Sequence, residues 1–307
     1  MTKTVLILGS SGRFGRTARA AFSYAGWDVQ LFDRSKDVLE DAAWGADLIV
    51  NSWNPPYADW AREVPALTAQ IIEVARNTGA TVLIPGNVYP YGTHMPALIN
   101  ADTPFVPSTP LGKIRYEMEQ AYNAAGVRTI VLRAGDFIDT AASGNWYDKI
   151  ITAKIAQGRI IYPGATDIPH SWAYLPDLAD AAVALSTLDL PTFTTVNFPG
   201  YTLSGVQLHR ALEAITGRQL KLKQMGWLPL QIATPFWPMA RNLLEMRYLW
   251  DTPHALINDK FGELLPDFCP TPLYEALASS IPVDIDPDRL VARDTVSLSL
   301  TNGPVDA

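Results

Sequence analysis

Three glycines near the N-terminus have the spacing of a phosphate-binding turn. Gly9, Gly12 and Gly15 follow an apolar run at residues 4–8 and precede apolar residues at helical spacing. The first glycine permits a tight turn, the second lets the backbone approach a phosphate, and the third lets helix and strand pack closely. The helix N-terminus would present unpaired N–H groups and a positive dipole to an anion. The pattern therefore predicts a pyrophosphate site, and a dinucleotide is the first ligand to consider.

The residues around this turn extend the predicted contacts. A second strand expected at residues 27–33 ends in Asp33, about 20 residues beyond the glycines, where an acid can bind the adenosine ribose. Asp33 favours NAD, whereas Arg13 and Arg34 are placed where they could hold the 2′-phosphate of NADP. We expect NAD because the acid occupies the strand end itself, and NADP is the alternative. The predicted cofactor contacts are Gly9, Ser11, Gly12, Arg13, Phe14, Gly15, Asp33, Arg34, Asn51, Ser52 and Trp53.

Strand-like and helix-like segments alternate through the first half of the chain. Further strands are expected at residues 46–51, 80–84 and 127–133, and helices at 65–77 and 113–125. Such alternation predicts an α/β fold with a doubly wound parallel sheet, in which ligands collect at the carboxyl ends of the strands. The glycine turn and the loops at residues 51–54, 85–89 and 133–136 should therefore line one site.

The alternation fades after Asp136, where aromatic residues and prolines become frequent. Helices are expected at residues 204–216 and 240–249. We predict a dinucleotide-binding Rossmann domain of residues 1–135 plus 170–199 and a smaller, partly helical substrate-binding region of residues 136–169 plus 200–285. Residues 286–307 lose apolar periodicity and are expected to form a C-terminal arm or tail.

Composition excludes several classes of function. The 307 residues are 48% hydrophobic, and 24 Lys and Arg against 31 Asp and Glu leave a formal charge of −7, which argues against nucleic acid and anionic membranes as partners. The single cysteine, Cys269, cannot form an internal disulfide, and the N-terminus does not resemble a signal peptide, so a cytoplasmic location is expected. The four histidines lack metal-ligand spacing, and no metal site is predicted.

Four segments of the chain resemble a known family, the extended or atypical short-chain dehydrogenase/reductases, in the branch that includes nucleotide-sugar epimerases and dehydratases. These segments are residues 9–15, 87–92 (Asn-Val-Tyr-Pro-Tyr-Gly), 112–119 (Gly-Lys-Ile-Arg-Tyr-Glu-Met-Glu) and 172–179 (Trp-Ala-Tyr-Leu-Pro-Asp-Leu-Ala). The resemblance covers most of the chain and implies a Rossmann domain, NAD or NADP, and a C-terminal substrate-binding portion. Reactions in the family range from epimerisation to carbonyl reduction, and some members sense the cofactor without turnover.

The chain departs from the family at the catalytic positions. The family places a Tyr four residues before a Lys, supported by a Ser or Thr after the fourth strand. Lys113 is present, but Thr109 and Pro85 occupy the places of the phenol and the hydroxyl. The resemblance implies that Lys113, at the start of a helix with the apolar stripe Ile114, Met118, Ala121 and Ala125, bonds the nicotinamide ribose and completes the cofactor contacts. The alternative is a solvated lysine that follows a Pro-Leu-Gly turn.

Tyr89 is the preferred candidate for the missing proton donor. Tyr89 and Tyr91 are the phenols of the loop after the fourth strand, which should approach the nicotinamide. A nearby Lys⁺ and the positive cofactor ring would favour a phenolate. Simple packing with one wet edge is the alternative for both tyrosines. The predicted catalytic residues are therefore Tyr89 and Lys113.

Two hypotheses follow. The first is an NAD(P)-dependent oxidoreductase or epimerase that acts by hydride transfer on a small carbonyl, an alcohol or a sugar nucleotide. The second is a non-catalytic, cofactor-sensing dinucleotide-binding protein, which the missing Tyr and Ser favour. A homodimer is also expected, because relatives pair through the helices that correspond to residues 65–77 and 113–125. Ala66, Ala69 and Ala75 offer a small-residue surface for such pairing, although the same surface could pack on the chain's own sheet.

Overall fold

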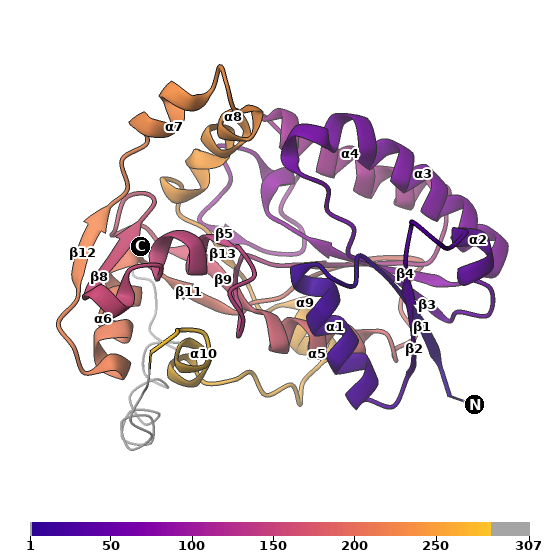
Figure 1. The fold of residues 1–307 in the computed structure, drawn as a ribbon. Coiled ribbons are helices and arrows are strands. Elements are labelled where there is room, and N and C mark those ends of the chain that lie inside the picture. The colour runs from indigo at the N-terminus through magenta and orange to yellow at the C-terminus, as the bar shows by residue number, and fades with distance from the viewer. Residues whose placement is uncertain (1, 284–307) are drawn as a thin grey trace.

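The computed structural model describes residues 2–283 and has a six-stranded parallel sheet at its centre (Figure 1). The strands are β1 (Thr4–Leu8), β2 (Asp28–Phe32), β3 (Leu48–Asn51), β4 (Thr81–Gly86), β6 (Thr129–Arg133) and β10 (Phe193–Asn197), in the order β10-β6-β4-β3-β1-β2. The chain moves from β1 to β2 on one side and then returns to β3 on the other. This reversal confirms the predicted doubly wound α/β fold and places a switch point at the carboxyl end of β1.

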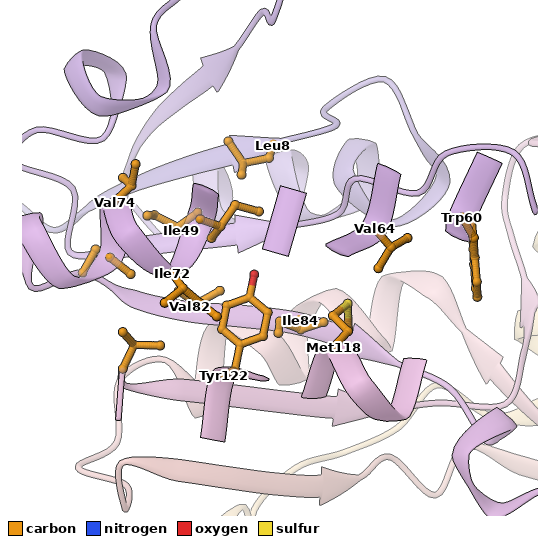
Figure 2. Close-up of a cluster of buried hydrophobic side chains, with 14 of the residues drawn as sticks. Leu8, Ile49, Trp60, Val64, Ile72, Val74, Val82, Ile84, Met118 and Tyr122 are labelled. Atoms are coloured by element: carbon orange, nitrogen blue, oxygen red, sulfur yellow. The ribbon is translucent and has the colours of Figure 1, made fainter. Parts of the chain in front are cut away.

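Helices cover both faces of the sheet, and this agrees with the largely apolar sequences of its central strands β1, β3 and β4. Helices α1 (Arg13–Tyr24) and α5 (Leu175–Leu185) cover one face, and α3 (Trp60–Thr78) and α4 (Pro110–Ala125) cover the other (Figure 1). Alternate residues of β1 enter different cores, Val5 and Ile7 on the α1 side and Leu6 and Leu8 on the α3 side. Figure 2 shows the second core, where Tyr122 and Met118 of α4 pack against side chains of β3 and β4. The predicted arm at residues 286–307 lies outside the described residues.

Local signals set the ends of α3 and α4. Both helices end at a glycine in the left-handed conformation, Gly79 with φ of 74° and Gly126 with φ of 67°. Helix α3 begins at Trp60, five residues before the expected start, and tolerates Pro65 near its first turns. Helix α4 begins at Pro110, a residue whose fixed φ suits the first helical position. The start of α4 is therefore three residues earlier than the sequence pattern suggested.

The second half of the chain forms small sheets and short helices beside the central sheet. The remaining strands are β5 (Leu98–Ile99), β7 (Asp136–Ile138), β8 (Arg159–Tyr162), β9 (His170–Tyr174), β11 (Tyr201–Leu203), β12 (Lys221–Gln224) and β13 (Ala255–Leu256). The remaining α-helices are α2 (Leu39–Ala42), α6 (Gly205–Thr216), α7 (Leu228–Ala233), α8 (Pro238–Glu245), α9 (Lys260–Leu264) and α10 (Leu273–Ser279). Strand β9 lies between β11 and β7, and β8 pairs with β12. The predicted domain boundaries stay a prediction.

A third core holds this region together around Tyr147, Trp172, Leu208, Trp250 and Leu277. Five short helical turns complete the described chain, namely η1 (Tyr57–Asp59), η2 (Tyr89–Tyr91), η3 (Tyr147–Ile151), η4 (Ile155–Gln157) and η5 (Met246–Trp250). Within residues 2–283, no helix has both the length and the apolar character needed to cross a membrane.

Candidate functional site

The glycine turn between β1 and α1 is so closely packed that side chains would not fit. Gly9 has a φ of +75°, and a Cβ on it would lie 2.8 Å from the carbonyl oxygen of Ser52. A Cβ on Gly15 would collide with the carbonyl oxygen of Gly9 and lie 2.5 Å from Oγ of Ser52. The Gly12 amide donates to the Gly9 carbonyl at 2.9 Å. Helix α1 has no side-chain N-cap and no acid in its first turn, so its first amides suit an anion.

The loop after β3 packs against the glycine turn and is hydrogen-bonded to the end of β1. The Ser52 amide donates to the Leu8 carbonyl at 3.1 Å, and its hydroxyl donates to the same carbonyl. Asn51 is buried, its amide donates to the Tyr122 hydroxyl at 3.3 Å, and its Oδ1 has no hydrogen-bond partner among the described residues. The Trp53 ring packs edge-on against Phe32 of β2, 5.4 Å away. Ser52 and Trp53, which are predicted to contact the cofactor, therefore also help to hold β1, β2 and β3 together.

Other predicted cofactor contacts have different surroundings. Phe14 is 4% exposed and packs in the core under α1, whereas Ser11 is exposed. Arg13 donates from Nε to the Ser143 carbonyl at 3.2 Å and from a terminal nitrogen to the Gly144 carbonyl at 2.5 Å. Arg13 thus ties the start of α1 to the segment after β7.

The two charged candidates after β2 also differ from each other. Asp33 accepts hydrogen bonds from the amide and hydroxyl of Ser35 and pairs with Lys36 at 2.9 Å. The Ser35 hydroxyl and then Lys36 hold the pKa of Asp33 well below its ordinary value. Arg34 is exposed. The end of β2 therefore presents a carboxylate that stays ionised at neutral pH.

At the start of α4, Thr109 acts as a helix cap. Its Oγ1 accepts a hydrogen bond from the Gly112 amide at 3.1 Å, the usual role of a threonine at this position. The Leu111 amide donates to the Glu245 carboxylate at 2.7 Å. The side chain of Lys113 is exposed. The Thr109 hydroxyl, which the sequence analysis expected at the place of the phenol, is thus engaged in capping.

Arg115 is a buried cation near the candidate site that the sequence analysis did not single out. It is 7% exposed, donates to the Pro85 carbonyl at 2.7 Å and lies 5.5 Å from the centre of the Trp60 ring. Burial lowers the pKa of its guanidinium, an effect that the Glu119 charge opposes. A signal was present in the sequence, because Leu111, Arg115, Met118 and Tyr122 repeat at helical spacing and are all buried.

Tyr89 and Tyr57 form a pair of phenols at the ends of β3 and β4. Their hydroxyls are 2.7 Å apart, although 32 residues separate them in the chain. Burial raises the pKa of Tyr89 well above its ordinary value of 10, and the charge of Asp136 acts in the same direction. Burial also raises the pKa of Tyr57. Burial thus favours the neutral form of the Tyr89 phenol over the phenolate.

A second pair, Asp136 and His170, lies at the starts of the paired strands β7 and β9. Oδ2 of Asp136 is 2.8 Å from Nε2 of His170, whose ring stacks on Trp250 with centroids 4.3 Å apart. His254 lies against the same imidazole, and burial, followed by the charge of His170, lowers the pKa of His254 to about 3. No pattern in the sequence predicted that Asp136 and His170 lie together.

The four loops expected to share one site end parallel strands that are neighbours in the sheet. Hydrogen bonds join two of these loops, from Arg133 to the Asn87 carbonyl and from Ala134 to the Gly86 carbonyl. Within the described residues, no group of three or more His, Cys, Asp or Glu side chains is arranged to hold a metal ion.

Comparison with known proteins shows similarity in structure. No family model matches the sequence, and no curated protein matches it. The chain is similar to MoeE5 in complex with UDP-glucose and NAD, with a TM-score of 0.70, 13% identity, and coverage of 96% of this chain and 99% of that one. The chain is also similar to UDP-glucuronic acid 4-epimerase from Bacillus cereus in complex with NAD, with a TM-score of 0.67 and 13% identity. This match covers 91% of this chain and 97% of that one.

A third similar structure has a different activity. Triphenylmethane reductase from Citrobacter sp. gives a TM-score of 0.67 at 13% identity and covers 92% of this chain and 100% of that one. The likeness extends over nearly the whole of each chain. At such identities it establishes the fold that this chain shares with these proteins, and it leaves the reaction open.

Proposed function

We propose that this chain is an NAD-dependent oxidoreductase or epimerase of the extended short-chain dehydrogenase/reductase type. Its substrate would be a small carbonyl, an alcohol or a sugar nucleotide. The observation that carries the proposal is the glycine turn at the end of β1, where Gly9 and Gly15 leave no room for a Cβ and the first turn of α1 is free of side-chain caps. The similarity to the NAD-bound structures of MoeE5 and the Bacillus cereus epimerase supports it.

The residues of the turn fit a dinucleotide. The amides that begin α1 would hold the pyrophosphate, and Asp33 would accept hydrogen bonds from the adenosine ribose. NAD is preferred over NADP because the ionised Asp33 would repel a 2′-phosphate and Arg13 is already bonded to the 143–144 carbonyls. The nicotinamide, when bound, supplies a hydride acceptor or donor for the substrate carbon.

Tyr89 is the proposed proton donor. Its high pKa keeps the hydroxyl protonated, which suits donation to a carbonyl oxygen during reduction. Tyr57, hydrogen-bonded to Tyr89 at 2.7 Å, orients that hydroxyl. The resemblance implies that a cation near the start of α4 contacts the nicotinamide ribose, and α4 contains two candidates, the exposed Lys113 and the buried Arg115.

One observation favours the alternative, a dinucleotide-binding protein without turnover. Thr109 is a helix cap and Pro85 has no hydroxyl, so the family's acid and its partner are both missing. Calorimetric titration with NAD and NADP, followed by assays with carbonyl compounds and UDP-sugars, separates the possibilities. Binding with turnover supports the enzyme, binding without turnover supports the sensor, and no binding of either dinucleotide contradicts both.

A homodimer through α3 and α4 is also proposed. Ala66 and Ala69 are exposed on α3, whereas Ala75 packs in the chain's own core, so two of the three alanines are available to a partner. Sedimentation at micromolar concentration should show twice the chain mass of 33.7 kDa. A single species at the monomer mass would contradict the proposal.

A further inference from the structure

Two buried arginines, Arg115 of α4 and Arg133 of β6, lie near one buried glutamate, Glu119 of α4. Arg133 and Glu119 are 0% and 1% exposed, and both oxygens of Glu119 accept from Arg133, at 3.2 and 2.7 Å. Arg115 is buried nearby and forms no salt bridge with any residue of the described chain. The three side chains therefore carry one unit of positive charge in excess. A buried charge without a partner is costly, and natural proteins retain one where it has a use.

The hydrogen bonds of Arg115 are also incomplete. One terminal nitrogen donates to the Pro85 carbonyl, and the guanidinium lies over the Trp60 ring, but Nε is buried without a partner among the described residues. A guanidinium has five N–H donors and stays protonated in proteins. An unpaired buried donor costs free energy that an acceptor oxygen of a ligand would recover. Arg115 thus has the properties of a ligand-binding group.

The strand order indicates which part of a dinucleotide could reach Arg115. Asp33 at the end of β2 marks the adenosine side, and the glycine turn after β1 marks the pyrophosphate. The other half of the molecule must then extend over β3 and β4, which follow β1 in the sheet. Pro85, the hydrogen-bond partner of Arg115, belongs to β4, and Trp60 follows the loop after β3. Arg115 therefore lies on the nicotinamide side.

We propose that Arg115, and not Lys113, donates hydrogen bonds to the ribose on the nicotinamide side of the bound dinucleotide. The proposal rests on the proposed function. Residues that are two positions apart in an α-helix lie about 200° apart around its axis. Lys113 and Arg115 therefore point in nearly opposite directions. The exposure of Lys113 and the burial of Arg115 agree with this geometry. Only Arg115 faces the ends of the strands.

Truncated ligands can test this assignment without a substrate. ADP ends before the second ribose, ADP-ribose contains it, and NAD adds the nicotinamide. Calorimetry with each ligand should show that Arg115→Met weakens ADP-ribose and NAD about tenfold or more, the effect expected for lost charge-assisted hydrogen bonds, and leaves ADP within about twofold. Lys113→Met, the matched control on the same helix, should leave all three affinities within about twofold.

Each other outcome is informative. Equal loss of ADP and ADP-ribose affinity in Arg115→Met would assign the residue a structural role and overturn the proposal, and so would unchanged ADP-ribose affinity or a large effect of Lys113→Met. Failure of the unmodified protein to bind ADP or NAD would instead contradict the proposed function.

Thermal unfolding provides an independent readout. Arg115→Met should keep or raise the melting temperature because it removes an unpaired buried charge, whereas loss of a structural arginine would lower it. If Arg115→Met does not fold, Arg115→Lys replaces it. That variant keeps the charge but lacks Nε, so it should reduce the ratio of ADP-ribose to ADP affinity. An unchanged ratio would overturn the proposal.

Discussion

At the end of β1, the turn of Gly9, Gly12 and Gly15 is shaped by backbone contacts, whereas the ends of β3 and β4 are shaped by side chains from distant segments. A Cβ at Gly9 or Gly15 would collide with backbone or side-chain atoms of Ser52, so only glycine fits at these two positions. Near β4, Tyr57 and Tyr89 share a hydrogen bond across 32 residues of sequence. The proposed dinucleotide site thus combines a glycine turn set by close backbone packing with a second half built from side chains that meet only in the folded chain.

The largest effect is expected from Gly15→Val. The new side chain would collide with the Gly9 carbonyl and Ser52, so NAD binding should become undetectable by calorimetry and the free energy of unfolding should fall by about 1–3 kcal/mol in urea titration. Gly226→Val is the matched control, because no atom lies within 4 Å of the place that its Cβ would take. Retained binding in Gly15→Val would show that the turn does not hold the ligand.

Tyr89→Phe should produce the next largest effect, on the other half of the site. Removal of the proton donor should lower the turnover rate about 10²-fold or more, and NAD affinity should stay within about twofold. Tyr24→Phe is the control, since Tyr24 is 95% exposed. A full rate in Tyr89→Phe would transfer the proton role to Tyr91 or an ordered water.

The burial of His254 predicts a pH dependence of stability near the Asp136–His170 pair. Its pKa is lowered from 6.5 to about 3 in the folded chain, so between these values the unfolded chain binds a proton that the folded chain does not. The free energy of unfolding should therefore fall as the pH is lowered, by about 2 kcal/mol between pH 6.5 and 5.

Urea titrations at several pH values measure this slope. His254→Gln should make it shallower, whereas His94→Gln, a change at an exposed histidine, should leave it unchanged. An equal slope in the protein with and without His254 would show that the packing around Trp250 does not exclude the charged imidazole.

The smallest effect is expected at the adenosine side. Asp33→Asn should weaken NAD about tenfold and reduce the preference for NAD over NADP, because it removes a carboxylate that stays ionised at neutral pH. Asp28→Asn, at the other end of β2, is the control. Calorimetry with both dinucleotides measures the ratio, and a preference for NADP in the unmodified protein would contradict the assignment.

Helix periodicity was the point at which prediction from the sequence was weakest. The predicted stripe of Ile114, Met118, Ala121 and Ala125 does pack against the core, but the most buried side chains of α4 are those of Leu111, Arg115, Met118, Glu119 and Tyr122. The buried face contains two charged residues, which a search for apolar positions passes over. Lys113 was singled out because it matches the lysine of the resembled family, whereas no apolar pattern pointed to Arg115.

The sequence by itself determined the sheet, the glycine turn and the position of Asp33. These features depend on rules that act over a few residues, such as the apolar strand, the freedom of glycine and the spacing from turn to acid. Only the tertiary structure decided that Tyr57 meets Tyr89, that Asp136 meets His170 across 34 residues, and that Arg115 is buried with no salt bridge to any described residue. The physical reason is that parallel strands bring their carboxyl ends to one edge, so side chains far apart in sequence share an environment whose burial and charge no local pattern contains.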